Sequence, residues 1–105
     1  NCDYYVFWYQ KKESGTFERL LNIDKSSSEI ERYSHAEKDD FSAKIQQNNC
    51  ELIISSVKPS HAASYYCSCW KSGSGIMIFG SGTRLVVSDA ALVQPVLSVY
   101  PAASR

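Results

Sequence analysis

The sequence predicts an all-β domain built as an antiparallel sandwich or barrel. Segments rich in aromatic and β-branched residues recur from one end to the other, and turn signals separate them roughly every 8–12 residues. No segment shows convincing helical periodicity. The hydrophobic content of 44% is ordinary for a packed domain and too high for a disordered chain.

The first half of the chain contains two clear strand segments. Residues 4–10 are aromatic and β-branched, which suits a largely covered strand, and residues 17–23 form the returning strand after a turn at 13–15. Residues 24–40 have little apolar periodicity. We expect a loop with a weak edge strand there.

The second half of the chain contributes the remaining strands. Residues 41–46 alternate between apolar and polar side chains, and apolar residues within 52–57 mark the inward face of the next strand. Proline interrupts residues 59–63, which are expected to be a connector and not a helix. Residues 64–70 and 76–87 are the last two expected strands.

Charge and composition exclude several functions. Eleven basic residues balance eleven acidic ones, so the long-range attraction that a nucleic-acid binder needs is missing. No apolar run approaches the roughly 20 residues that cross a bilayer. Four cysteines in so short a chain indicate an oxidising, extracellular setting.

Catalysis, metal binding and cofactor binding are also not expected. Cys67-x-Cys69 has no matching second pair, and the two histidines lack the spacing of zinc ligands or of a nucleophilic triad. A Cys/His metal-binding protein or a small hydrolase is kept as the remote alternative from another class.

The chain is expected to be a piece of something longer. Residues 1–88 form one incomplete domain, residues 89–94 are a linker, and residues 95–105 are the first strand of a following domain.

Three features in a fixed order identify a family resemblance. Trp8 lies in Phe7-Trp8-Tyr9-Gln10, Cys67 ends Ala63-Ser64-Tyr65-Tyr66-Cys67, and Phe79-Gly80-Ser81-Gly82-Thr83 begins twelve residues later. Over residues 4–88 this order resembles an immunoglobulin variable domain from its C strand to its G strand. The resemblance implies a V-type antiparallel β-sandwich, truncated here because strands A and B are missing. It gives structural roles to the buried tryptophan, the tyrosine corner, the F-strand cysteine and two G-strand glycines: Trp8, Tyr65, Cys67, Gly80 and Gly82.

Within this family the chain is most similar to T-cell receptor gamma chains. Cys67-Ser68-Cys69-Trp70 resembles the start of their third hypervariable loop, and Glu18-Arg19-Leu20 sits as a similar triplet does there. An immunoglobulin light chain is the alternative, because it shares the tryptophan, cysteine and joining motifs. Residues 95–105 resemble the start of a constant domain in either class.

The gamma-chain resemblance implies a function and partners. The chain would be the antigen-recognising variable region of a plasma-membrane receptor, facing the extracellular side, with its membrane anchor outside this fragment. It would pair with a delta-type chain, associate with invariant signalling subunits through missing parts, and bind an antigen that the sequence does not name.

The resemblance also sets expectations for the cysteines. Cys67 is expected to pack beside Trp8, and the strand that carries its usual disulfide partner is absent here. Cys2 lies about 20 Å along the chain from Trp8, too far to bond Cys67 instead, so Cys67 is expected to be a free thiol. Cys2 and Cys69 would lie at the same loop end, where a disulfide between them is geometrically open. Cys50 is expected to be a buried thiol, with a Cys2–Cys50 bond as the less favoured alternative.

Two surfaces are expected to carry the binding function. Strand alternation gathers an aromatic patch and one lysine on the outer face of a sheet, where the partner chain would pair. The second and third loops would contact the antigen. The interface residues are Tyr9, Lys11, Phe17, Tyr66 and Phe79. The loop residues are Asp24, Lys25, Ser26, Ser27, Ser28, Cys69, Trp70, Lys71, Ser72, Gly73, Ser74, Gly75 and Ile76.

One departure from the family pattern predicts a contact between two polar side chains. The family usually has a basic residue before the D-strand Phe and an Asp four residues before the corner tyrosine. Here these positions hold Asp40 and His61, with the signs exchanged. We expect them to pair; the alternative is two independent solvated side chains.

Overall fold

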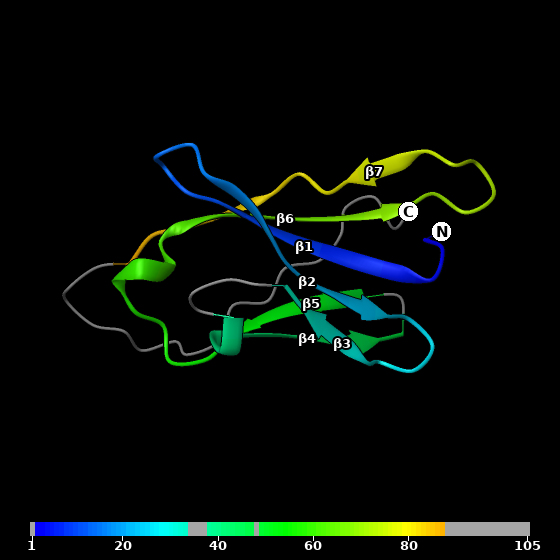
Figure 1. Ribbon diagram of the computed structural model, residues 1–105, viewed down its shortest axis with the longest axis horizontal. Coiled ribbons are helices and arrows are strands. Elements are labelled where there is room, and N and C mark those ends of the chain that lie inside the picture. Colours follow the sequence, from blue (N-terminus) through cyan, green and yellow to red (C-terminus); the bar gives the residue numbers. More distant parts are fainter. Residues whose placement is uncertain (1, 34–37, 48, 88–105) are drawn as a thin grey trace.

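A computed structural model describes residues 2–33, 38–47 and 49–87, which form two antiparallel β-sheets packed face to face (Figure 1). Two single 3-10 turns, η1 (Lys38–Asp40) and η2 (Pro59–His61), are the helical elements of the described part. The strands are β1 (Tyr5–Lys11), β2 (Phe17–Asp24), β3 (Ile30–Arg32), β4 (Phe41–Gln46), β5 (Asn49–Ile54), β6 (Ala63–Trp70), β7 (Met77–Phe79) and β8 (Thr83–Leu85).

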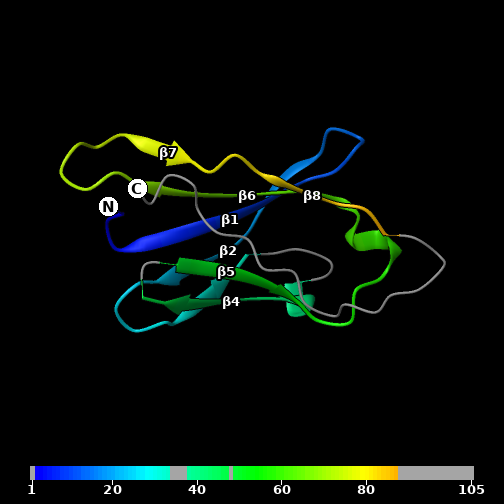
Figure 2. The ribbon, with the colours of Figure 1, turned by 180° about the vertical axis from the view of Figure 1, so that it is seen from behind.

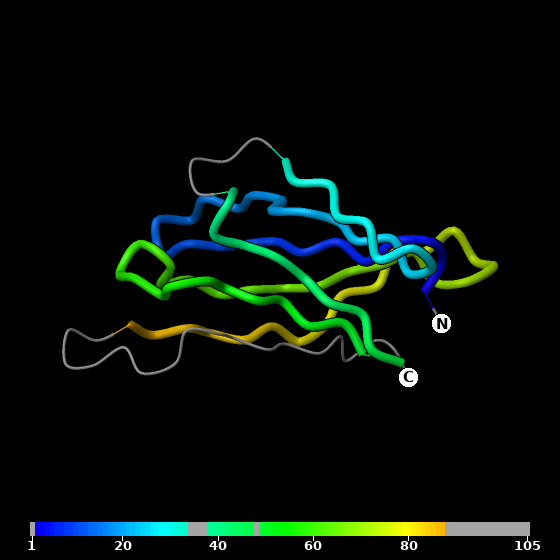
Figure 3. The backbone as a smooth tube through the Cα atoms, turned by 90° about the horizontal axis from the view of Figure 1, so that it is seen from below, coloured from blue at the N-terminus to red at the C-terminus, as the bar shows by residue number. Residues whose placement is uncertain are grey.

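The larger sheet has six strands in the order β3-β2-β1-β6-β7, with β8 also paired to β6. Seen from behind, β8 lies along β6 beyond the end of β7 (Figure 2). The smaller sheet consists of β4 and β5. The strands run along the long direction of the molecule, so that turns and loops collect at its two ends (Figure 3).

The core lies between the two sheets and is centred on Trp8. This side chain is 0% exposed and sits on β1 directly opposite Cys67 of β6. Its indole N–H donates a hydrogen bond to the Sγ atom of Cys50 on β5, 3.4 Å away. Apolar residues of both sheets surround this centre: Val6, Leu20, Leu21, Ile23, Phe41, Ala43, Leu52, Ile54, Ala63 and Tyr65.

The expected tyrosine corner is present near the start of β6. The Tyr65 hydroxyl donates to the backbone carbonyl of His61 at 2.5 Å and accepts a hydrogen bond from the Gln10 amide at 3.1 Å. Tyr65 is therefore buried without leaving its hydroxyl unsatisfied.

The expected Asp40–His61 pair is confirmed. His61 is fully buried, and its Nε2 atom lies 2.8 Å from Oδ2 of Asp40, while its Nδ1 atom accepts the backbone N–H of Lys58 at 3.1 Å. Because Nδ1 accepts, the proton of the neutral ring is on Nε2 and points at the carboxylate. This hydrogen bond, together with Lys58 Nζ at 3.3 Å, lowers the pKa of Asp40.

The structure corrects one expected strand. The single strand expected at 76–87 forms two short strands. Strand pairing is interrupted at residues 80–82, where Gly82 adopts a positive φ of 89°. The connector expected at 59–63 contains one 3-10 turn, and the weak edge strand expected within 24–40 is confirmed as the three residues of β3. The linker and constant-domain strand expected at 89–105 lie outside the described residues.

Candidate functional site

Three segments that are distant in sequence meet at one end of the sandwich. Residues 2–4, the β2–β3 loop and the β6–β7 loop all lie at the end where the N-terminus is marked (Figure 1). The disulfide that the sequence left open is present: Cys2 and Cys69 are bonded, with their Cα atoms 5.5 Å apart. Cys2 also pairs with Lys71 as an isolated β-bridge. The first and third of these segments are therefore covalently joined, and we call the three together the loop end.

The second loop, which joins β2 to β3, is polar and internally hydrogen-bonded. The Oδ1 atom of Asp24 accepts from the backbone and hydroxyl of Ser26, both at 2.8 Å, and these bonds lower the pKa of Asp24. Ser28 follows at a positive φ of 64°. The Nζ atom of Lys25 donates a hydrogen bond of 2.7 Å to the carbonyl oxygen of Cys2. The second loop is thus tied to the first segment.

The third loop is a hairpin tip that spans Lys71–Ile76. The Lys71 N–H donates to the Ile76 carbonyl at 2.7 Å, and Gly73 and Gly75 adopt positive φ angles. Trp70 and Ile76 are the large exposed apolar side chains here. Cys69, predicted among the loop residues, is buried within β6 and bonded to Cys2, so its contribution at this end is structural.

The outer face of the larger sheet carries the predicted aromatic residues in mutual contact. The rings of Tyr9 and Phe17 stack at 5.1 Å, Tyr9 lies 5.7 Å from Phe79, and Phe17 lies 6.3 Å from Tyr66. Phe17 and Phe79 are 50% and 49% exposed, and Lys11 is also exposed. We call these five residues the aromatic patch.

A hollow opens beside the aromatic patch, lined by four of its members and Gly80. Gly82 packs directly behind the patch, because a Cβ at this position would lie 2.4 Å from the Tyr66 ring. This close approach of the backbone to Tyr66 explains why Gly82, the second glycine of the joining motif Phe79-Gly80-Ser81-Gly82-Thr83, carries no side chain.

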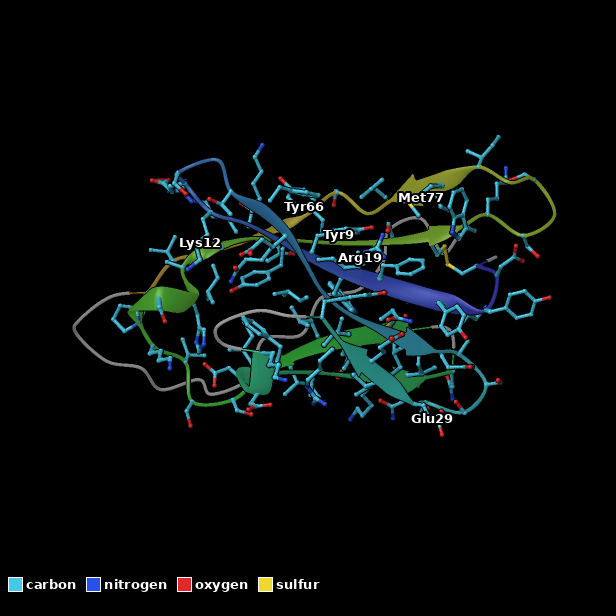
Figure 4. All side chains as sticks on the ribbon, viewed as in Figure 1. Tyr9, Lys12, Arg19, Glu29, Tyr66 and Met77 are labelled. Carbon is cyan, nitrogen blue, oxygen red and sulfur yellow. A yellow bond between two sulfur atoms is a disulfide. The ribbon has the colours of Figure 1, made fainter. Side chains whose placement is uncertain are left out.

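Sequence reasoning missed Arg19 as a member of this face. Its guanidinium lies over the rings of Phe7, Tyr9 and Tyr33, at 4.9, 5.5 and 5.1 Å from their centres. Figure 4 labels Arg19 beside Tyr9, with Tyr66 further along the same face. The signal available in the sequence was its spacing of two from Phe17, which places both side chains on one face of a strand.

The remaining cysteines are free thiols inside the core, as expected. Burial raises the pKa of Cys50 to about 11 and that of Cys67 to about 12. Neither forms part of a metal site, since no group of three ligating side chains occurs among the described residues. Within residues 2–33, 38–47 and 49–87, no helix is long and apolar enough to span a membrane.

The fold and these surfaces define an immunoglobulin variable-type domain, and comparison with known proteins agrees. Residues 1–88 match the family described as Immunoglobulin V-set domain. The chain belongs to this family, which is not a family of enzymes.

The relatives that match are antigen-receptor variable regions. The chain is 31% identical over 83 residues to the mouse T-cell receptor gamma chain V region 5/10-13 and 27% identical over 84 residues to V region V108A. These matches cover 78% of this chain and 61% and 62% of the relatives, so the chain spans about three fifths of their length.

Solved structures of marsupial T cell receptors share the fold. One is 28% identical with a TM-score of 0.76, covering 87% of this chain and 43% of that one. Another is 35% identical with a TM-score of 0.71, covering 83% and 40%. The chain thus has an immunoglobulin V-type fold and is similar in sequence and structure to the variable regions of T-cell receptors.

Proposed function

We propose that this chain is the variable region of a T-cell receptor gamma chain, which pairs through the aromatic patch with a delta-type chain and binds antigen at the loop end. The observation that carries the proposal is the aromatic patch itself. Aromatic rings in mutual contact on the outer face of a sheet, with Phe17 and Phe79 about half exposed, are typical of the core of a protein–protein interface. The gamma-chain relatives support the choice of receptor class.

The loop end supports ligand binding by its combination of fixed and adaptable parts. The Cys2–Cys69 bond and the Lys25–Cys2 hydrogen bond hold the three segments together. Trp70 and Ile76 provide exposed apolar anchors, and the Ser72–Gly75 stretch between them can adapt its shape. We expect this domain to lie on the extracellular side of a membrane receptor, and the signalling subunits to bind other parts of that receptor.

Pairing is tested by co-expressing the full chain with a delta-type chain in a mammalian secretory system and measuring the heterodimer by co-precipitation. Phe79→Ser removes a half-exposed ring from the aromatic patch and should lower recovery of the heterodimer at least about tenfold, as for an interface anchor. Ile76→Ser is the matched control, because it removes a similarly exposed apolar side chain at the loop end.

Three outcomes contradict this proposal. The patch is not the pairing surface if Phe79→Ser and Ile76→Ser pair equally well. A heavy-chain variable domain that pairs in preference to every delta-type chain would make the protein an immunoglobulin light chain. Failure to pair with any variable domain would refute heterodimer formation. Protection of the buried thiols Cys50 and Cys67 from alkylation shows that each variant is folded.

A further inference from the structure

We propose that Arg19 determines which partner the domain accepts, by binding a carboxylate that the partner's variable domain presents near the centre of the shared face. This inference rests on the proposed pairing through the aromatic patch. It goes further by naming the chemistry of the partner's surface.

The Arg19 side chain is held in place before any partner arrives. Nη1 donates to the Tyr33 hydroxyl at 3.3 Å and Nη2 to the Tyr9 hydroxyl at 3.2 Å, while the rings of Phe7, Tyr9 and Tyr33 lie against the guanidinium. The hydrogen bond to Tyr33, then that to Tyr9, raises the pKa of Arg19. An ordered cation loses less conformational entropy on binding than a free side chain does.

The guanidinium keeps binding capacity for a partner. It has more N–H donors than its two hydrogen bonds use, and its side chain is exposed. Among the described residues, no carboxylate forms an ion pair with Arg19. A carboxylate is the group that accepts two parallel N–H bonds from a guanidinium, which gives both affinity and orientation.

Charge argues for a different chain as partner and against a second copy of this one. The two charged side chains next to the aromatic rings on this face, Arg19 and Lys11, are cations, and the exposed Glu31 lies farther out, on the edge strand β3 opposite Asn22. In a symmetric dimer the same patch faces itself, so these cations would be brought together. A partner face that carries Asp or Glu near its centre complements them.

The test displays the full chain on yeast and titrates it with soluble delta-type variable domains selected for binding to it. Arg19→Glu should weaken binding about 10- to 100-fold, whereas Lys44→Glu, the same charge change on the exposed side of β4, should stay within about twofold. Scanning the partner's face by Asp or Glu→Arg substitution should find one variant that restores binding to Arg19→Glu. A purely structural role of Arg19 would not give this rescue.

The two proposals fail in different ways. If Arg19→Glu binds as the parent does while Phe79→Ser abolishes binding, the inference is overturned and the pairing function stands. Loss of binding by Arg19→Glu without rescue by any reversed partner charge also overturns it. If no variable domain binds the parent chain, the pairing function falls, and the inference falls with it.

Discussion

Removing the Cys2–Cys69 disulfide is the most informative perturbation of stability, because this bond joins the start of the described sequence to the end of β6. The two cysteines are 67 residues apart, and the chain-entropy relation for a loop of this size gives about 4 kcal/mol of stabilisation at 25 °C. Cys2→Ser with Cys69→Ala should therefore lower the urea midpoint by about 2–4 M. Fluorescence reports the transition, because Trp8 is fully buried in the folded core, whereas Trp70 is already 44% exposed.

A reductant provides the matched control. Adding dithiothreitol to the parent chain should reproduce the double variant, and it should not alter the double variant further, because Cys50 and Cys67 are already free thiols. Cys50→Ser should keep the full response to reductant. A midpoint that moves by less than about 0.5 M in both the variant and the reduced parent would refute the loop-closure reasoning.

Three further predictions concern the Asp40–His61 pair, the buried thiols and the tyrosine corner. Asp40→Asn should cost about 1–3 kcal/mol. Since the folded-state pKa of Asp40 is lowered by His61, the parent should lose this contribution as pH falls below about 4, and the variant's urea midpoint should change less over that range. Cys50 and Cys67 should resist iodoacetamide at pH 8 in the folded chain, and because their pKa values are raised, stability should decline as pH rises through about 8.5, where the unfolded thiols ionise. Tyr65→Phe removes the hydroxyl of the tyrosine corner and should lower the free energy of unfolding by about 1–3 kcal/mol.

Much of the fold was predictable from the sequence because it depends on strand alternation and on a few large side chains. Trp8 and Cys67 were expected to pack together, and they are direct cross-strand partners. The exchanged pair of Asp40 and His61 was also predictable, because it departs from the family pattern at two positions at once. The contact between Cys2 and Cys69 followed from the loop end that the two strands share.

Spacing from Phe17 indicates the face on which Arg19 lies, but its cross-strand contact with Tyr9 was harder to predict because it depends on a β-bulge. The register between β1 and β2 shifts between Trp8 and Tyr9, so Leu20 and Leu21 are both buried and Arg19 faces Tyr9. Bulges depend on local pairing geometry that a single sequence does not specify. The same limit applies to the break between β7 and β8, where apolar residues on both sides of the joining glycines read as one continuous strand.

Gly82 links the stability of the domain to its proposed pairing surface. Gly82→Ala would force an alanine to adopt a φ of 89° and would place its Cβ 2.4 Å from the Tyr66 ring, so the ring must move. The backbone strain costs about 1–3 kcal/mol, and movement of Tyr66 should also weaken pairing. Gly73→Ala is the control: its φ is 75°, but nothing lies within 4 Å of the added Cβ. If both variants lose equal stability and pair equally well, the contact with Tyr66 has no role and only the backbone conformation requires glycine; a larger loss in Gly82→Ala, with weaker pairing, shows that the joining glycine shapes the aromatic patch.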